Sequence, residues 1–214
     1  MKNLWDNPVM QLLQQLADLV LLNLVWLICS LPVVTIGPAT VAMYTVARSI
    51  LAGGGVRVIS MFCEAFAHRF MRHMLAGLAA LACAGVLAVD FLFLAHQNTG
   101  FRPILFGLLL FVCILVLLTA VCLFPLLAEY DLGIKDGVYR AFLLGVRHLC
   151  RSGAAVAIQL LPVLLFLFAP PWFLLLIPLW AGCYFSAAAS LSLRLLQPVL
   201  AGGAEGNFNR AEHG

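Results

Sequence analysis

Four long runs of apolar residues constrain this chain more than any other feature. A helix needs roughly 20 mostly apolar residues to cross a bilayer core of about 30 Å, and runs near or above that length occupy residues 12–34, 74–95, 104–128 and 172–196. Two shorter runs lie at residues 39–52 and 153–169. Because 64% of the 214 residues are hydrophobic and only 10% are charged, one soluble core could not enclose this much apolar surface. The sequence therefore predicts an all-α integral membrane protein.

We expect a single transmembrane helical domain over residues 1–197. It is a bundle of five to six transmembrane helices with two cytoplasmic amphipathic helices, and the number is six if the short run at 39–52 crosses the membrane. Residues 198–214 are mainly small and polar without a periodic pattern, so they predict a disordered tail.

The distribution of Lys and Arg indicates which connections face the cytoplasm. Most basic residues lie between the second and third segments or between the fourth and fifth: Arg48, Arg57, Arg69, Arg72, Lys135, Arg140, Arg147 and Arg151. The connection at 96–103 contains only Arg102. The two basic connections, between the second and third segments and between the fourth and fifth, are therefore predicted to be cytoplasmic. If residues 39–52 cross the membrane, both termini are cytoplasmic too; if they form a re-entrant or surface helix, the N-terminus lies outside.

Both long connections have helical periodicity. The first carries an apolar stripe in an amphipathic helix that leads into the third segment, formed by Ile59, Phe62, Phe66 and Phe70. The second carries a similar stripe beside a basic face, formed by Val138, Phe142, Val146 and Leu149. Such helices suit the surface of an anionic membrane leaflet.

A polar motif interrupts the first two apolar runs. Its members are candidate contacts for a ligand or a partner: Asp18, Asn23, Pro32, Thr35, Gly37, Pro38 and Tyr44. One interpretation is a rigid helix hairpin in which Thr35 caps a helix and Gly37 adopts a conformation closed to other residues. The other is a helix start near Pro38 whose amides bind an anionic or hydroxyl-rich group.

Ionisable and amide side chains within apolar helices are costly, so each needs a purpose. Asp18 has two interpretations, a structural role with Arg48 as a possible partner or a role toward substrate or protons. Asp90, Gln159 and Arg194 are weaker candidates of the same kind.

Small residues recur every four positions on two helices. Ala76, Ala80, Ala84 and Ala88 form one stripe and Gly182, Ser186 and Ser190 form another. Stripes of this kind let helix backbones approach closely. They predict packing within this bundle or, alternatively, docking of another membrane subunit.

Signatures of catalysis, metal binding or phosphate binding are missing from the sequence. The seven cysteines form no C-x-x-C pair, which predicts free thiols. We therefore expect no enzyme activity, no cofactor, no metal and no nucleic-acid partner.

The run LPVVTIGPA at residues 31–39, preceded by Asp18, Asn23 and Trp26 and followed by Tyr44, resembles the opening of the YesL-like family of bacterial membrane proteins, domain of unknown function 624. Residues 125–151 resemble the middle of that family, so the likeness extends over about residues 6–196. It implies a plasma-membrane protein whose genes often accompany sugar importers of the ATP-binding-cassette type. It implies no catalytic residue.

Two functional hypotheses follow. The first is an accessory or regulatory component associated with carbohydrate import by such a transporter. The alternative is a small transporter or channel with an internal polar path lined by Asp18 and Asn23.

Overall fold

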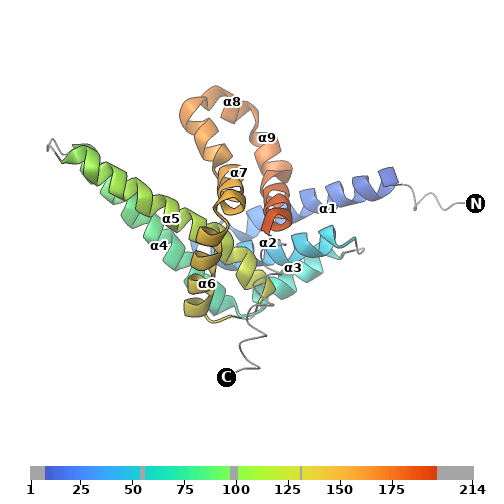
Figure 1. Ribbon diagram of the computed structural model, residues 1–214. Coiled ribbons are helices and arrows are strands. Elements are labelled where there is room, and N and C mark those ends of the chain that lie inside the picture. Colours follow the sequence, from blue (N-terminus) through green and yellow to red (C-terminus); the bar gives the residue numbers. More distant parts are fainter. Residues whose placement is uncertain (1–7, 54–55, 97–100, 131, 197–214) are drawn as a thin grey trace, which may run out of the picture.

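The computed structural model describes residues 8–53, 56–96, 101–130 and 132–196 (Figure 1). All regular structure in these residues is helical, which confirms the predicted fold class. Six helical stretches are long and apolar enough to cross a membrane: Met10–Cys29, Val33–Leu51, Phe70–His96, Arg102–Glu129, Leu149–Phe168 and Ile177–Leu196. The residues of the predicted tail lie outside the described part of the chain.

The first two spans form a helical hairpin. Helix α1 (Pro8–Cys29) ends before Pro32, which disfavours helical conformation in the residue before it. A 3₁₀ turn, η2 (Val33–Thr35), then leads into α2 (Ile36–Leu51). The first span therefore stops short of residue 34, and the second begins earlier than the predicted residue 39.

Helix α2 lies at the centre of the molecule and packs against α1, α3 (Val58–Ala67), α4 (Phe70–His96) and α5 (Arg102–Glu129). Its small residues Gly37, Ala39, Ala42 and Ala47 are buried, so neighbouring helices approach it from several sides. In the apolar window of the second span 56% of the residues are buried, whereas in that of the third span only 6% are buried. The shortest of the apolar runs is therefore the core of the bundle.

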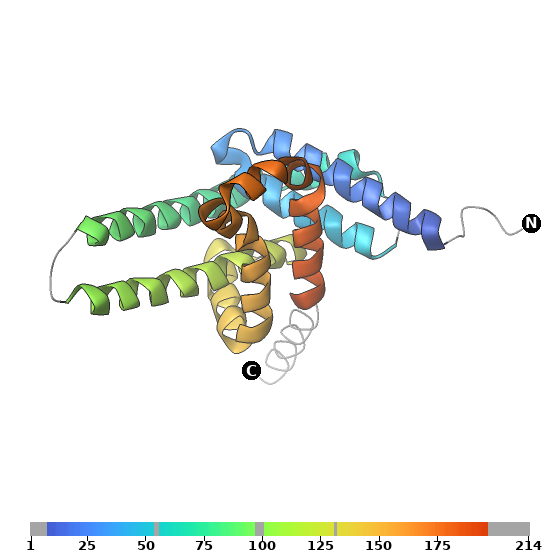
Figure 2. The ribbon, with the colours of Figure 1, turned by 90° about the horizontal axis from the view of Figure 1, so that it is seen from above.

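The long helices α4 and α5 form a hairpin that extends away from the rest of the chain, on the side opposite the outer end of α1 (Figure 2). Many of their large apolar side chains are exposed, among them Val89, Leu92, Leu108 and Phe111. Lipid is as apolar as these side chains, so their exposure is stable in a bilayer.

The last part of the chain is less regular. It comprises α6 (Ile134–Arg147), α7 (Leu149–Phe168), two short helices, α8 (Pro170–Leu175) and α9 (Ile177–Leu179), and a π-helical turn, η3 (Trp180–Tyr184), which continues as helix through residues 185–196. Pro125 and Pro162 lie inside helices, whereas Pro178 lies in the first turn of α9, where its missing N–H is tolerated. The last span consequently begins at Ile177 and not at Trp172.

The first amphipathic helix differs from its prediction. Helix α3 ends at Ala67, and Arg69 adopts a left-handed conformation with φ of 51° before α4 begins at Phe70. The chain therefore breaks where a continuous helix into the third span was expected. Phe62 is fully buried, whereas Ile59 of the predicted stripe is 53% exposed.

The second amphipathic helix packs with a different face from the predicted one. Gly137, Ala141 and Gly145 of α6 are buried against α5, because small residues allow close backbone approach. A Cβ atom added to Gly145 would lie only 3.3 Å from the Leu118 carbonyl oxygen. The predicted apolar stripe of Val138, Phe142, Val146 and Leu149 is exposed instead.

Candidate functional site

Asn23 connects α1 to the last span. Its side chain is fully buried, its Nδ2 donates to the Trp180 carbonyl oxygen at 3.2 Å, and its Oδ1 accepts from the Ser186 backbone N–H at 3.2 Å. The Trp180 carbonyl belongs to the first residue of η3 and the Ser186 N–H lies two residues after its end, where the hydrogen-bond ladder of the helix is irregular. The Asn23 amide therefore provides hydrogen-bond partners to two main-chain groups for which the surrounding apolar side chains offer none.

Two serines extend this contact between helices. Ser186 is fully buried, and its hydroxyl donates to the Leu19 carbonyl oxygen at 2.7 Å or to that of Cys183 at 3.0 Å. The Ser190 hydroxyl donates within its own helix, to the Ser186 carbonyl oxygen at 2.8 Å. The stripe of Gly182, Ser186 and Ser190 thus includes an internal packing contact, although a Cβ atom at Gly182 would meet open space.

Thr35 stabilises the hairpin by a route other than the predicted cap. It occupies the N-cap position of α2 without a side-chain cap hydrogen bond. Its hydroxyl instead points back to the carbonyl oxygens of Cys29, at 2.6 Å, and Pro32, at 2.7 Å. The hydroxyl therefore stabilises the end of α1, where carbonyl groups lack helical partners.

Gly37 is needed for close approach and not for an unusual backbone conformation. It lies within α2, and a Cβ atom added to it would come within 2.9 Å of the Gly77 Cα. A Cβ atom added to Gly77 would lie 2.8 Å from the Gly37 nitrogen. The prediction of a special conformation at Gly37 is wrong, because the two glycines instead let α2 and α4 cross backbone to backbone.

Pro38 and Tyr44 are also buried in the core, whereas Pro32 is exposed. The Tyr44 hydroxyl accepts a hydrogen bond from Gln159 Nε2 at 2.7 Å, which joins α2 to α7. The Gln159 amide therefore has a structural partner within the spans.

Asp18 is separate from this buried network. It is half-buried on α1, and Arg48 forms its ion pair with Glu129 Oε1, at 2.8 Å, and not with Asp18. Asp90 and Arg194 are exposed. The described residues therefore bring Asn23, Ser186 and the start of α2 into one core but do not bring Asp18 into a polar path with them.

Glu129, the partner of Arg48, lines a cavity of about 360 Å³ between α2, α3, the start of α4 and the end of α5. The ionisable residues of its lining are Glu64, His68, Arg69, His73 and Glu129. The sequence analysis did not single out Glu129. The available signal was a carboxylate directly after the apolar run 104–128 and a basic residue, Arg48, within the run 39–52. Among the described residues, no group of His, Cys, Asp and Glu could hold a metal ion.

The stripe on α4 divides into two parts. Ala76 is buried and Ala80 half-buried, near the crossing with α2, whereas Ala84 and Ala88 are exposed. A Cβ atom added to the adjacent Gly85 would meet nothing within 4 Å. Ala84 and Ala88 therefore leave this side of α4 exposed, and farther along the helix Phe91 contacts Phe106 of α5, with ring centroids 4.9 Å apart.

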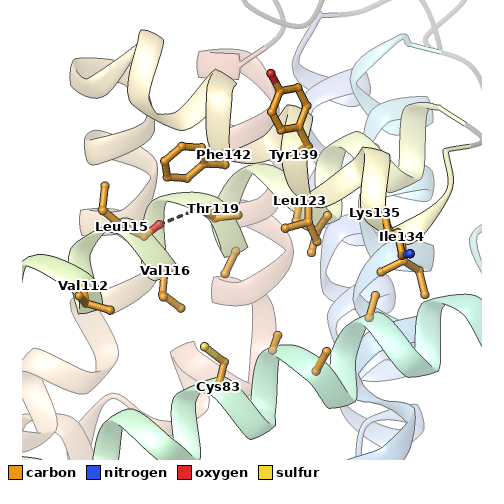
Figure 3. Close-up of a pocket in the computed structure, with 15 residues that line it drawn as sticks. Cys83, Val112, Leu115, Val116, Thr119, Leu123, Ile134, Lys135, Tyr139 and Phe142 are labelled. Atoms are coloured by element: carbon orange, nitrogen blue, oxygen red, sulfur yellow. Dashed lines mark hydrogen bonds between the residues drawn. The ribbon is translucent and has the colours of Figure 1, made fainter. Parts of the chain in front are cut away.

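An apolar groove of about 750 Å³ lies between α4, α5 and α6 (Figure 3). Cys83 projects into it from α4 and Val116 from α5. The Thr119 hydroxyl at its wall is satisfied by the Leu115 carbonyl oxygen at 2.8 Å. The polar ends of its lining therefore belong mainly to Lys135 and Tyr139, one helical turn apart on α6.

These features define a multi-span helical membrane protein in which Asn23, Tyr44, Gln159 and Ser186 form hydrogen bonds between spans. Residues 19–91 match the family described as "Protein of unknown function, DUF624". The chain therefore carries a DUF624 domain over about a third of its 214 residues, and the resemblance is confirmed there. The likeness of residues 125–151 lies beyond the matched stretch and stays a prediction. Comparison with curated proteins and with solved structures gave no match.

Proposed function

We propose that the protein is an accessory or regulatory membrane subunit that associates with a carbohydrate importer of the ATP-binding-cassette type. The observation that carries the docking part of this proposal is the outer half of α4. There Ala84 and Ala88 continue the side that packs on α2 through Gly77, but they are exposed. Small-residue faces are typical of helix–helix contacts in membranes. A transmembrane helix of a partner fits this face.

The carbohydrate part of the proposal rests on the family resemblance and the genes that accompany the family. The same resemblance supports location in a bacterial plasma membrane. The basic residues of α6 and of the connection before α4 support a cytoplasmic position for both, by the positive-inside rule.

The alternative, a small transporter or channel, has less support. It needs a polar path lined by Asp18 and Asn23, yet the Asn23 amide is bonded to the backbone of the last span and is fully buried. Reconstituted vesicles that show flux of a sugar, an ion or protons, and lose it with Asp18→Ala, would favour the alternative. We propose no catalytic role, because the sequence carries no signature of catalysis.

Affinity purification from native membranes in mild detergent tests the accessory role. We expect the importer permease or its ATPase to co-purify with the unmodified chain, and Ala84→Leu to reduce this recovery. Val86→Leu is the matched control, because residue 86 is exposed and lies two positions away, on another side of α4. Absence of both importer subunits from the unmodified sample would overturn the proposal. Equal recovery of the importer with Ala84→Leu and Val86→Leu would show that the exposed face of α4 is not the contact surface.

A further inference from the structure

We propose that the groove between α4, α5 and α6 binds one anionic phospholipid, with an acyl chain in the groove and the phosphate at Lys135. The groove includes Ala76 and Ala80 of the small-residue stripe on α4 but not the exposed Ala84 and Ala88, and the proposal does not depend on the importer.

The place of the groove in the bilayer identifies an apolar occupant. Its walls come from α4 and α5, two helices long and apolar enough to span the membrane. Water has few partners there, because the Thr119 hydroxyl is already bonded within α5. The volume of about 750 Å³ is typical of sites that enclose a small molecule, which range over about 300–1,000 Å³.

The length of the groove fits a single leaflet. Its α5 wall runs from Val112 to Leu123, which at 1.5 Å per residue is about 16 Å. That is about half of the roughly 30 Å hydrocarbon core. Val112 lies near the middle of α5 and Leu123 lies toward its end at Glu129. The groove therefore extends from one membrane surface to about the midplane, as one phospholipid chain does.

The charge at the surface end favours an anionic headgroup. Figure 3 shows Lys135 beside Ile134 at one end of the groove and Val112 at the other. Lys135 is exposed and has a cationic ammonium group. Tyr139, one helical turn away, adds an aromatic ring with a polar hydroxyl. Three basic residues of α6 outnumber its single acidic residue, Asp136. A phosphate beside the Lys135 ammonium would pair opposite charges where the chain meets the headgroup region.

Native mass spectrometry of the purified full chain tests the proposal, with equal amounts of phosphatidylglycerol and phosphatidylcholine added to the detergent. We expect one phosphatidylglycerol molecule to be retained in preference. Lys135→Ala should reduce this preference about fivefold, as expected for one cation at the membrane surface. Arg140→Ala, on the same helix but outside the groove lining, should leave it unchanged.

A second pair of variants tests the groove itself. Ala80→Leu places a larger side chain in the groove and should lower retention of both lipids, whereas Ala82→Leu, on another side of α4, should not. Each variant is compared with the parent by its circular dichroism and melting temperature. Equal retention of the two lipids, or equal losses with Lys135→Ala and Arg140→Ala, would overturn the proposal. Disulfide-linked dimers formed through Cys83 as the sole cysteine would overturn it too, by assigning the groove to a second copy.

Discussion

Replacement of Asn23 by Leu is the sharpest test of how the bundle is held together. The variant keeps a side chain of similar size but loses the donor to the Trp180 carbonyl and the acceptor for the Ser186 N–H. Hydrogen bonds between membrane helices contribute on average about 0.6 kcal/mol each and at most about 1.7 kcal/mol. Since at least these two are lost and their two backbone partners stay buried, we expect the free energy of unfolding to fall by about 1–3 kcal/mol.

Reversible unfolding in mixed micelles, followed by tryptophan fluorescence during titration with a denaturing detergent, measures this change. Gln14→Leu is the control, because it removes an amide from an exposed position of the same helix. We expect the control to change stability much less than Asn23→Leu does. Equal stability of Asn23→Leu and the parent would refute the conclusion that this amide joins the two spans.

Three further predictions concern other contacts between helices. Gly77→Ala should destabilise the protein by about 1–3 kcal/mol, because its Cβ would meet the backbone of α2, and the same unfolding titration should show it. Tyr44→Phe should lower stability by about 1 kcal/mol through loss of the Gln159 hydrogen bond, and combining it with Gln159→Leu should cost less than the two single effects together. A double-mutant cycle of Arg48→Ala and Glu129→Ala should give a coupling of about 0.2–1 kcal/mol that falls as salt is raised, since half of the Arg48 side chain is exposed.

Hydropathy predicted the fold class well because crossing a bilayer imposes a length on each helix that is visible in sequence. The ends of the spans were predicted less well where proline determines them. The first span stops before Pro32, and the last begins near Pro178, because proline restricts the residue before it and is tolerated in a first helical turn.

The packing faces could not be predicted from hydrophobic stripes. In a membrane an apolar stripe is equally stable against lipid, so hydrophobicity does not indicate which side of a helix contacts protein. Helix α6 illustrates this, since Gly137 and Ala141 are buried while Val138 and Phe142 are exposed. Small residues carried the information about contacts, as Gly37 and Gly77 also demonstrate.

Partners of the buried polar residues were beyond sequence reasoning because they are distant in the chain and are often backbone atoms. Asn23 forms hydrogen bonds with groups 157 and 163 positions away in the chain. The π-helical turn that needs this amide leaves no simple sequence pattern. Arg48 was considered as a partner of Asp18, but the topology brings Glu129 to it instead.

These contacts also bear on how the matched stretch, residues 19–91, relates to the rest of the chain. It contains Asn23 and Tyr44, whose hydrogen-bond partners Trp180, Ser186 and Gln159 lie outside it. Within a bilayer a buried polar group without a partner is costly. The helices of the matched stretch therefore depend on α7 and the last span for their stability, even though α1 to α4 pack around α2. Any partner that contacts the exposed side of α4 consequently binds a surface whose geometry is set by the whole bundle.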